Sequence, residues 1–298
     1  MIFPADDLPA DDLPVIPDPS SERRASLPIA AEQIFPAPTG VGPEPRLIIT
    51  LPPDEPRDPV WTGLDVFRLT IMAILAIIVS GLAMLAVVHG ATFKARVSRL
   101  SALPELLIVA QMVAYLLILG YMYILVTKER GSPRFWKALH WNWPSTIWPY
   151  LLIGFAMQVV FVFIERFLPF PKETPFDELL RRHAAIVLIA VFAVTLGPLM
   201  EELFFRGFLY PVLARRIGIT AGILVSALGF GLMHAAQYGY SWASILLIFL
   251  VGVVLGTVRA KKNSVAAGVL VHMGYNGTIA LVMFAATDGF RHLEKLSQ

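Results

Sequence analysis

The sequence contains no cysteine, and few of its residues carry a charge. Of the 298 residues none is Cys, and Asp, Glu, Lys and Arg together make up 15%. The chain therefore forms no disulfide, offers no thiolate nucleophile and cannot ligate zinc through sulfur. Any chemistry that it performs must use oxygen and nitrogen groups.

An excess of charge of one sign is also absent. The formal net charge is +2, and Lys and Arg are scattered between apolar stretches. Such a chain has no strong positive field to attract a polyanion. We therefore expect no nucleic-acid partner.

Apolar residues are abundant, at 56% of the chain. This share exceeds that of a typical water-soluble domain, and about 20 helical residues are enough to cross a bilayer. We expect an integral, multi-pass protein surrounded by the lipid bilayer of a bacterial cell (inner) membrane. The apolar runs predict an all-α, polytopic membrane bundle of about seven transmembrane helices, at residues 66–89, 103–126, 145–164, 184–213, 219–236, 242–258 and 264–287.

Residues 1–60 differ from the rest of the chain. They hold 14 of the 23 prolines, and a pentapeptide, Ala-Asp-Asp-Leu-Pro, occurs twice in tandem. A segment of this composition buries too little apolar surface to offset its ordering entropy. We predict a disordered Pro/Asp-rich tail at 1–60, N-terminal transmembrane helices at 61–183, a second group of transmembrane helices at 184–287 and a C-terminal tail at 288–298.

Two adjacent carboxylates and an arginine fall inside the fourth predicted helix. A charged residue at bilayer depth costs at least about 2.5 kcal/mol, so each one needs a partner or a task. Glu202 and Arg206 have the spacing and order that favour an ion pair on one helix face. That pairing leaves Glu201, about 100° round the helix, without a local cation. Glu201 is therefore the candidate general base.

Three further polar residues lie at a similar depth. Glu201 comes 15 residues before the turn between helices four and five, and His234 comes 16 residues after it. Asn276 is 15 residues into the last helix from the same side, with His272 one turn shallower. At 1.5 Å per residue these groups reach roughly 22 to 24 Å from one surface. We expect them to meet within one slab of the membrane.

A proline lies just ahead of Glu201. Pro198 cannot donate a hydrogen bond to the carbonyl of Val194 and crowds it, so we expect the helix to bend there. Gly197 removes bulk at the same place, where a substrate or water can approach.

Three motifs together resemble those of the CPBP family, the type II CAAX prenyl endopeptidases and bacteriocin-processing or self-immunity proteases. The motifs are Glu-Glu-x-x-x-Arg at 201–206, Phe-x-x-x-His at 230–234 and His-x-x-x-Asn at 272–276. They stand in the family's order on the fourth, fifth and seventh predicted membrane helices, within residues 184–287. One such motif carries little information, but three intact motifs in order are specific.

The resemblance implies an intramembrane endopeptidase. Glu201 matches the residue that activates water, and His234 matches its partner in binding that water. His272 and Asn276 match the donors that stabilise the oxyanion. In supporting positions, Glu202 and Arg206 match the pair that shapes the site, beside the motif residue Phe230. The implied substrate is a membrane-associated protein or peptide, prenylated or not.

A divalent metal such as zinc is compatible with the residue types. Glu201, His234 and His272 offer one oxygen and two nitrogen ligands, which leaves a position for water. The sequence has no His-Glu-x-x-His helix, and members of the family are described both as metalloproteases and as glutamate proteases. We favour the metal-free mechanism.

Two other functions fit part of the pattern. An ion- or proton-coupled transporter also buries acids and histidines, but it predicts repeats with broken helices in both halves, and here the polar groups are confined to the second half. A non-catalytic CPBP-like scaffold would keep the same residues only to hold helices together. Intact Glu201 and His234 favour the protease.

Overall fold

The computed structural model of the protein describes residues 59–89, 104–171, 174–175 and 186–293. The predicted disordered tail at 1–60 lies almost wholly outside the described residues. Within them there are helices and turns and no strand, as the all-α prediction requires. The helices, in chain order, are α1 (Gly63–His89), α3 (Pro104–Ile124), η1 (Leu125–Glu129), α4 (Phe135–Ala138), α5 (Trp148–Glu165), α7 (Ile186–Val194), α8 (Leu196–Glu202), η2 (Leu203–Leu209), α9 (Tyr210–Ile217), α10 (Ile219–Met233), α11 (Trp242–Lys262) and α12 (Val265–Ala286).

Six of the seven predicted spans are long and apolar enough to cross a membrane. The fifth, predicted at 219–236, differs because α10 has 15 residues and ends at Met233. At 1.5 Å per residue it is about 22 Å long, shorter than a hydrocarbon core of about 30 Å. Hydropathy alone cannot locate this end. The six spans among the described residues are Gly63–Ala86, Ile108–Glu129, Trp148–Glu165, Ile186–Ile217, Trp242–Lys262 and Val265–Ala286.

The fourth span, Ile186–Ile217, consists of four successive segments, α7, α8, η2 and α9. The first break falls at Thr195, whose φ of −116° and ψ of −76° depart from regular helical values. Pro198 follows three residues later and has no N–H for the carbonyl of Val194. Where a bend at Pro198 was predicted, the structure has a break in the helix three residues earlier, at Thr195. The sequence did not signal η2, a π-helical segment that begins directly after Glu202.

Helix α12 packs closely against α5 through glycines on both helices. A Cβ at Gly154 of α5 would lie 2.2 Å from the carbonyl oxygen of Val271. A Cβ at Gly274 of α12 would lie 2.4 Å from the carbonyl oxygen of Leu151. Only glycine permits backbones to approach so closely. This contact fixes α12, which also packs against α7, α8 and α11.

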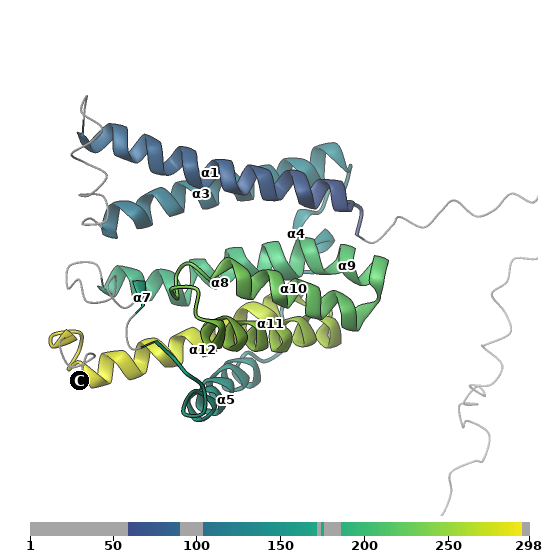
Figure 1. The fold of residues 1–298 in the computed structure, drawn as a ribbon. Coiled ribbons are helices and arrows are strands. Elements are labelled where there is room, and N and C mark those ends of the chain that lie inside the picture. The colour runs from purple at the N-terminus through teal and green to yellow at the C-terminus, as the bar shows by residue number, and fades with distance from the viewer. Residues whose placement is uncertain (1–58, 90–103, 172–173, 176–185, 294–298) are drawn as a thin grey trace, which may run out of the picture. The chain divides into compact units, whose positions relative to one another are not determined.

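Helices α1 and α3 lie side by side (Figure 1) and are joined to the fourth span. Trp61, just before α1, is buried with its ring centroid 4.6 Å from that of Phe208, and its Nε1 donates to the Phe208 carbonyl at 3.0 Å. Arg215 donates to the carbonyls of Pro59 and Trp61 at 2.7 and 3.1 Å. The start of α1 is thus held by the helix that carries Glu201.

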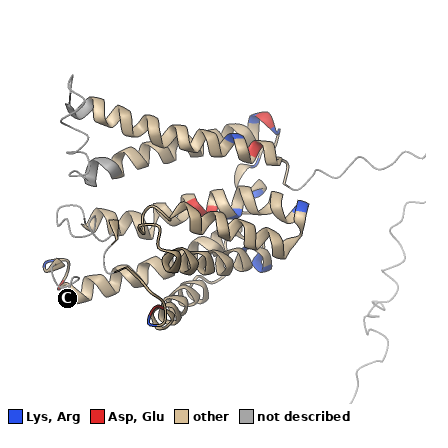
Figure 2. Cartoon of the chain, viewed as in Figure 1, with Lys and Arg blue, Asp and Glu red and all other residues tan. Residues whose placement is uncertain are grey.

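Charged residues gather at the helix ends, and one group of charged residues lies in the middle of the helices (Figure 2). Large apolar side chains such as Leu116 and Phe163 are exposed on outer faces, as expected of helices that face lipid. The charged group in the middle belongs to the junction of α8 and η2. It consists of Glu201, Glu202 and Arg206.

Candidate active site

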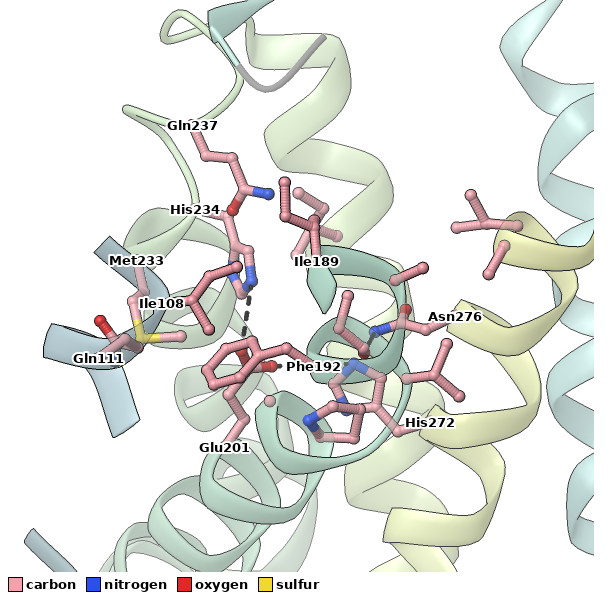
Figure 3. Close-up of a pocket in the computed structure, with 18 of the residues that line it drawn as sticks. Ile108, Gln111, Ile189, Phe192, Glu201, Met233, His234, Gln237, His272 and Asn276 are labelled. Carbon is pink, nitrogen blue, oxygen red and sulfur yellow. Dashed lines mark hydrogen bonds and ion pairs between the residues drawn. The ribbon is translucent and has the colours of Figure 1, made fainter. Parts of the chain in front are cut away.

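Glu201 is the centre of a polar cluster formed by α8, the end of α10 and α12. Its carboxylate oxygens lie 3.9 Å from Nε2 of His234 and 3.8 Å from Nε2 of His272. Figure 3 draws both interactions as dashed lines. The structure thus brings together three residues that are far apart in the sequence, as the count of residues from the membrane surface predicted.

His234 directly follows α10 and presents one ring nitrogen to Glu201. Its Nδ1 lies 2.9 Å from the carbonyl oxygen of Phe230, one turn earlier. Because a carbonyl only accepts, Nδ1 carries the proton, and Nε2 of the neutral ring has a lone pair. The 3.9 Å between Nε2 and Glu201 is too long for a direct hydrogen bond. It is short enough for one water molecule to bridge both atoms.

Glu202 is completely buried and has two partners. Arg206 Nη1 donates to its Oε1 at 2.8 Å, so the predicted ion pair is present. Arg206 Nη2 also donates to the carbonyl of Gly252 at 2.9 Å, which ties the pair to α11. Nδ1 of His272 lies 3.2 Å from the same Oε1. Since a carboxylate accepts, His272 donates through Nδ1 and turns its Nε2 towards Glu201.

Phe230 packs among these polar groups. The guanidinium carbon of Arg206 lies 4.7 Å from the centroid of its ring, within the range of a cation–π interaction. The rings of His234 and His272 lie 4.8 and 5.7 Å from the same centroid. The phenyl ring therefore packs against both imidazoles and covers the guanidinium of the buried Glu202–Arg206 ion pair.

Asn276 lies one turn after His272 and is anchored to α7. Its Nδ2 donates to the carbonyl of Ala193 at 2.7 Å, close to the break in the fourth span, where helix carbonyls lack intrahelical partners. An amide nitrogen has two hydrogens, so one N–H is left for another acceptor. Asn276 lines the same cavity as Glu201 and His234.

A cavity of about 640 Å³ extends over the cluster, with mostly apolar walls from α1, α3, α7, α10, α11 and α12. Two polar lining residues, Gln111 and Tyr115, belong to α3. The motifs gave no indication of them. The available signal was a glutamine and a tyrosine one turn apart within an apolar helix.

The arrangement of Glu201, His234 and His272 does not fit a zinc site. Zinc ligands at about 2.0 to 2.1 Å in tetrahedral geometry are roughly 3.3 Å apart. The two Nε2 atoms are 3.9 and 3.8 Å from Glu201, and no group of three or more His, Cys, Asp or Glu among the described residues could hold a metal ion. We therefore derive no reaction step through a metal.

Residues 183–278 match the family model described as type II CAAX prenyl endopeptidase Rce1-like. The matched segment contains all three motifs and excludes α1, α3 and α5. This match confirms the resemblance that the motifs indicated. No curated protein and no solved structure matches the chain.

Proposed function

We propose, from the match of residues 183–278 to the Rce1-like family model, that the chain is an intramembrane endopeptidase. Its substrate is a membrane-associated protein or peptide. The observation that carries the proposal is the convergence of Glu201, His234 and His272 beside an apolar cavity within the membrane spans. Peptide-bond hydrolysis needs a base for water and donors for an oxyanion, and these residue types supply both.

Water is bound between Glu201 and His234. One water hydrogen is donated to the Glu201 carboxylate and the other to Nε2 of His234, across the 3.9 Å that separates these atoms. This leaves a lone pair on the water oxygen for attack on the scissile carbonyl. Glu201 takes the proton as the new C–O bond forms, which makes it the general base.

The tetrahedral intermediate carries a negative oxygen that faces α12. Asn276 donates its second Nδ2 hydrogen to this oxygen, and His272 donates from Nε2 when the ring carries both protons. Glu202, which accepts from Nδ1 at 3.2 Å, balances the charge of that ring and fixes its orientation. The C–N bond then breaks, and Glu201 returns its proton to the leaving amine nitrogen. The products are a carboxylic acid and an amine.

Purified protein in liposomes with two quenched-fluorescent peptides tests this proposal. One peptide is farnesylated at a C-terminal CAAX sequence, and the other is an apolar peptide without a lipid. We expect wild type to cleave at least one of them, and Glu201→Gln and His234→Ala to lose cleavage. Equal cleavage by wild type and both variants would remove the catalytic assignment.

The same assay decides whether a metal takes part. In the proposed mechanism the water is held by Glu201 and His234 alone, so a chelator that removes zinc is expected to leave the cleavage rate unchanged. Loss of cleavage with the chelator, restored by added zinc, would contradict the metal-free mechanism and leave the endopeptidase assignment in place.

A further inference from the structure

Helix α3 places two polar side chains in the cavity that the proposed reaction does not use. Gln111 and Tyr115, one turn apart, line it together with Glu201. In the view of Figure 3, Gln111 lies on the opposite side of Glu201 from His272 and Asn276. Helix α3 is outside the segment that matches the family model, so nothing in that match assigns these residues a role.

Contacts with the fourth span hold Tyr115 in position. Its ring lies 5.5 Å from that of Phe192 in α7, with an angle of 12° between the planes, so the two rings stack. Gln111 and the Glu201 carboxylate are polar neighbours of the Tyr115 hydroxyl. The stacked ring therefore fixes Tyr115 on the wall of the cavity that Glu201 also lines.

The Gln111 amide can make several hydrogen bonds at once. It has two donor hydrogens and an acceptor oxygen, which match the C=O and N–H of a peptide group. Neighbouring residues of α3, Met112, Val113 and Leu116, are exposed and apolar. A carboxamide among such residues needs hydrogen-bond partners, and the cavity has room for them.

A peptide substrate in this cavity needs hydrogen-bond partners for its backbone. A peptide bond can be attacked only when the chain is locally extended, and an extended chain exposes backbone N–H and C=O groups. In an apolar, membrane-embedded environment each unpaired group costs several kcal/mol. A polar pair beside the scissile bond removes that cost.

We propose that Gln111 and Tyr115 bind main-chain groups of the substrate next to the scissile bond and hold it extended across Glu201. They are positioning residues, and this role rests on the proposed function. The cavity wall beside them is apolar and includes Ile108, Ile189 and Met233. The substrate class is therefore an extended apolar peptide segment, recognised through its backbone and its hydrophobic side chains.

Binding is measured with Glu201→Gln in nanodiscs, so that cleavage does not interfere. The probe is a fluorescein-labelled Leu/Ala/Phe peptide, with analogues in which one backbone amide at a time is replaced by an ester and so lacks its N–H. We expect Gln111→Met to raise Kd for the parent peptide about fivefold or more, the loss of one hydrogen bond. One or two neighbouring esters are expected to weaken binding while Gln111 is present, and to have no further effect in Gln111→Met.

Matched variants separate recognition from folding. Tyr123→Phe makes the same change as Tyr115→Phe at a tyrosine of α3 that is 51% exposed. Gln158→Met makes the same change as Gln111→Met in α5, outside the residues that line the cavity. With Glu201 intact, Gln111→Met and Tyr115→Phe are expected to raise KM about fivefold with kcat changed less than twofold, and the controls to change neither.

Unchanged Kd and KM in Gln111→Met and Tyr115→Phe, or equal sensitivity to every ester, would overturn the pairing with the backbone. If Gln111→Met does not fold, Tyr115→Phe, which removes a single oxygen, decides the question. Should wild type and Glu201→Gln cleave equally, the proposed reaction fails. The binding measurement still gives its own answer in that case, because it needs no cleavage.

Discussion

Glu201 and Glu202 are adjacent in the sequence, but the fold gives them opposite surroundings. The side chain of Glu202 is 0% exposed and bonded to Arg206 and His272, whereas that of Glu201 is 20% exposed and faces the cavity. The i,i+4 spacing predicted that Glu202, and not Glu201, pairs with Arg206, because this spacing concerns a single helix turn. The contact with His272 depends on how α8 and α12 pack, which one helix cannot reveal.

The two glutamates should differ in what their loss does to stability. Glu202→Gln leaves Arg206 buried without its ion pair, and breaking a buried pair costs about 3 to 5 kcal/mol. We expect a clearly lower Tm in detergent together with loss of cleavage. Glu201→Gln should abolish cleavage with Tm within a few degrees of wild type. If both variants unfold at the wild-type temperature, the ion pair does not stabilise the fold as described.

Gly268 of α12 provides a test of the buried carboxylate without changing any polar group. A Cβ at this position would lie 2.9 Å from Oε2 of Glu202, closer than real contacts permit. Gly268→Ala should therefore displace Glu202, disturb His272 and reduce cleavage at least about tenfold. Gly277→Ala, on the same helix, meets only Val194 at 3.7 Å and serves as the control. Equal activity of the two variants would contradict a fixed Glu202.

At the scale of elements, an irregularity of the helix ahead of Glu201 was predictable, and the π-helical η2 and short α10 were not. The irregularity was expected from Pro198, because proline removes a hydrogen-bond donor wherever it stands in a helix. The wider turn of η2 is stabilised by tertiary contacts, such as the bond from Trp61 to the carbonyl of Phe208. The helix preferences of neighbouring residues cannot predict a contact between residues so far apart in the sequence.

The approach of α5 to α12 gives a prediction at this scale. Gly154→Ala places a methyl group 2.2 Å from the carbonyl oxygen of Val271 and must push the helices apart. We expect destabilisation of about 1 to 3 kcal/mol, measured by thermal unfolding in detergent, with reduced cleavage because α12 moves. Gly120→Ala in α3, where a Cβ meets nothing within 4 Å, should leave Tm unchanged or slightly raised. A stable, fully active Gly154→Ala would show that the contact is looser than described.

For the whole molecule, the order of apolar runs and three motifs predicted a membrane bundle with its polar residues at one level. Depth could be counted because helices cross the bilayer and rise by a fixed distance per residue. Counting residues from the membrane surface does not reveal which helices pack against one another. The side chains of Gln111 and Tyr115 reach the cavity through packing of α3 against α7, and no motif records such packing.

The most direct test of the account is the ratio of cleavage rates for wild type and Glu201→Gln on one peptide in the same liposomes. Glu165→Gln, at the end of α5 and outside the residues that line the cavity, is the matched control. The account predicts that Glu201→Gln lowers the rate at least about a hundredfold, the contribution of a general base, while Glu165→Gln stays close to wild type. A Glu201→Gln rate equal to that of wild type would contradict it.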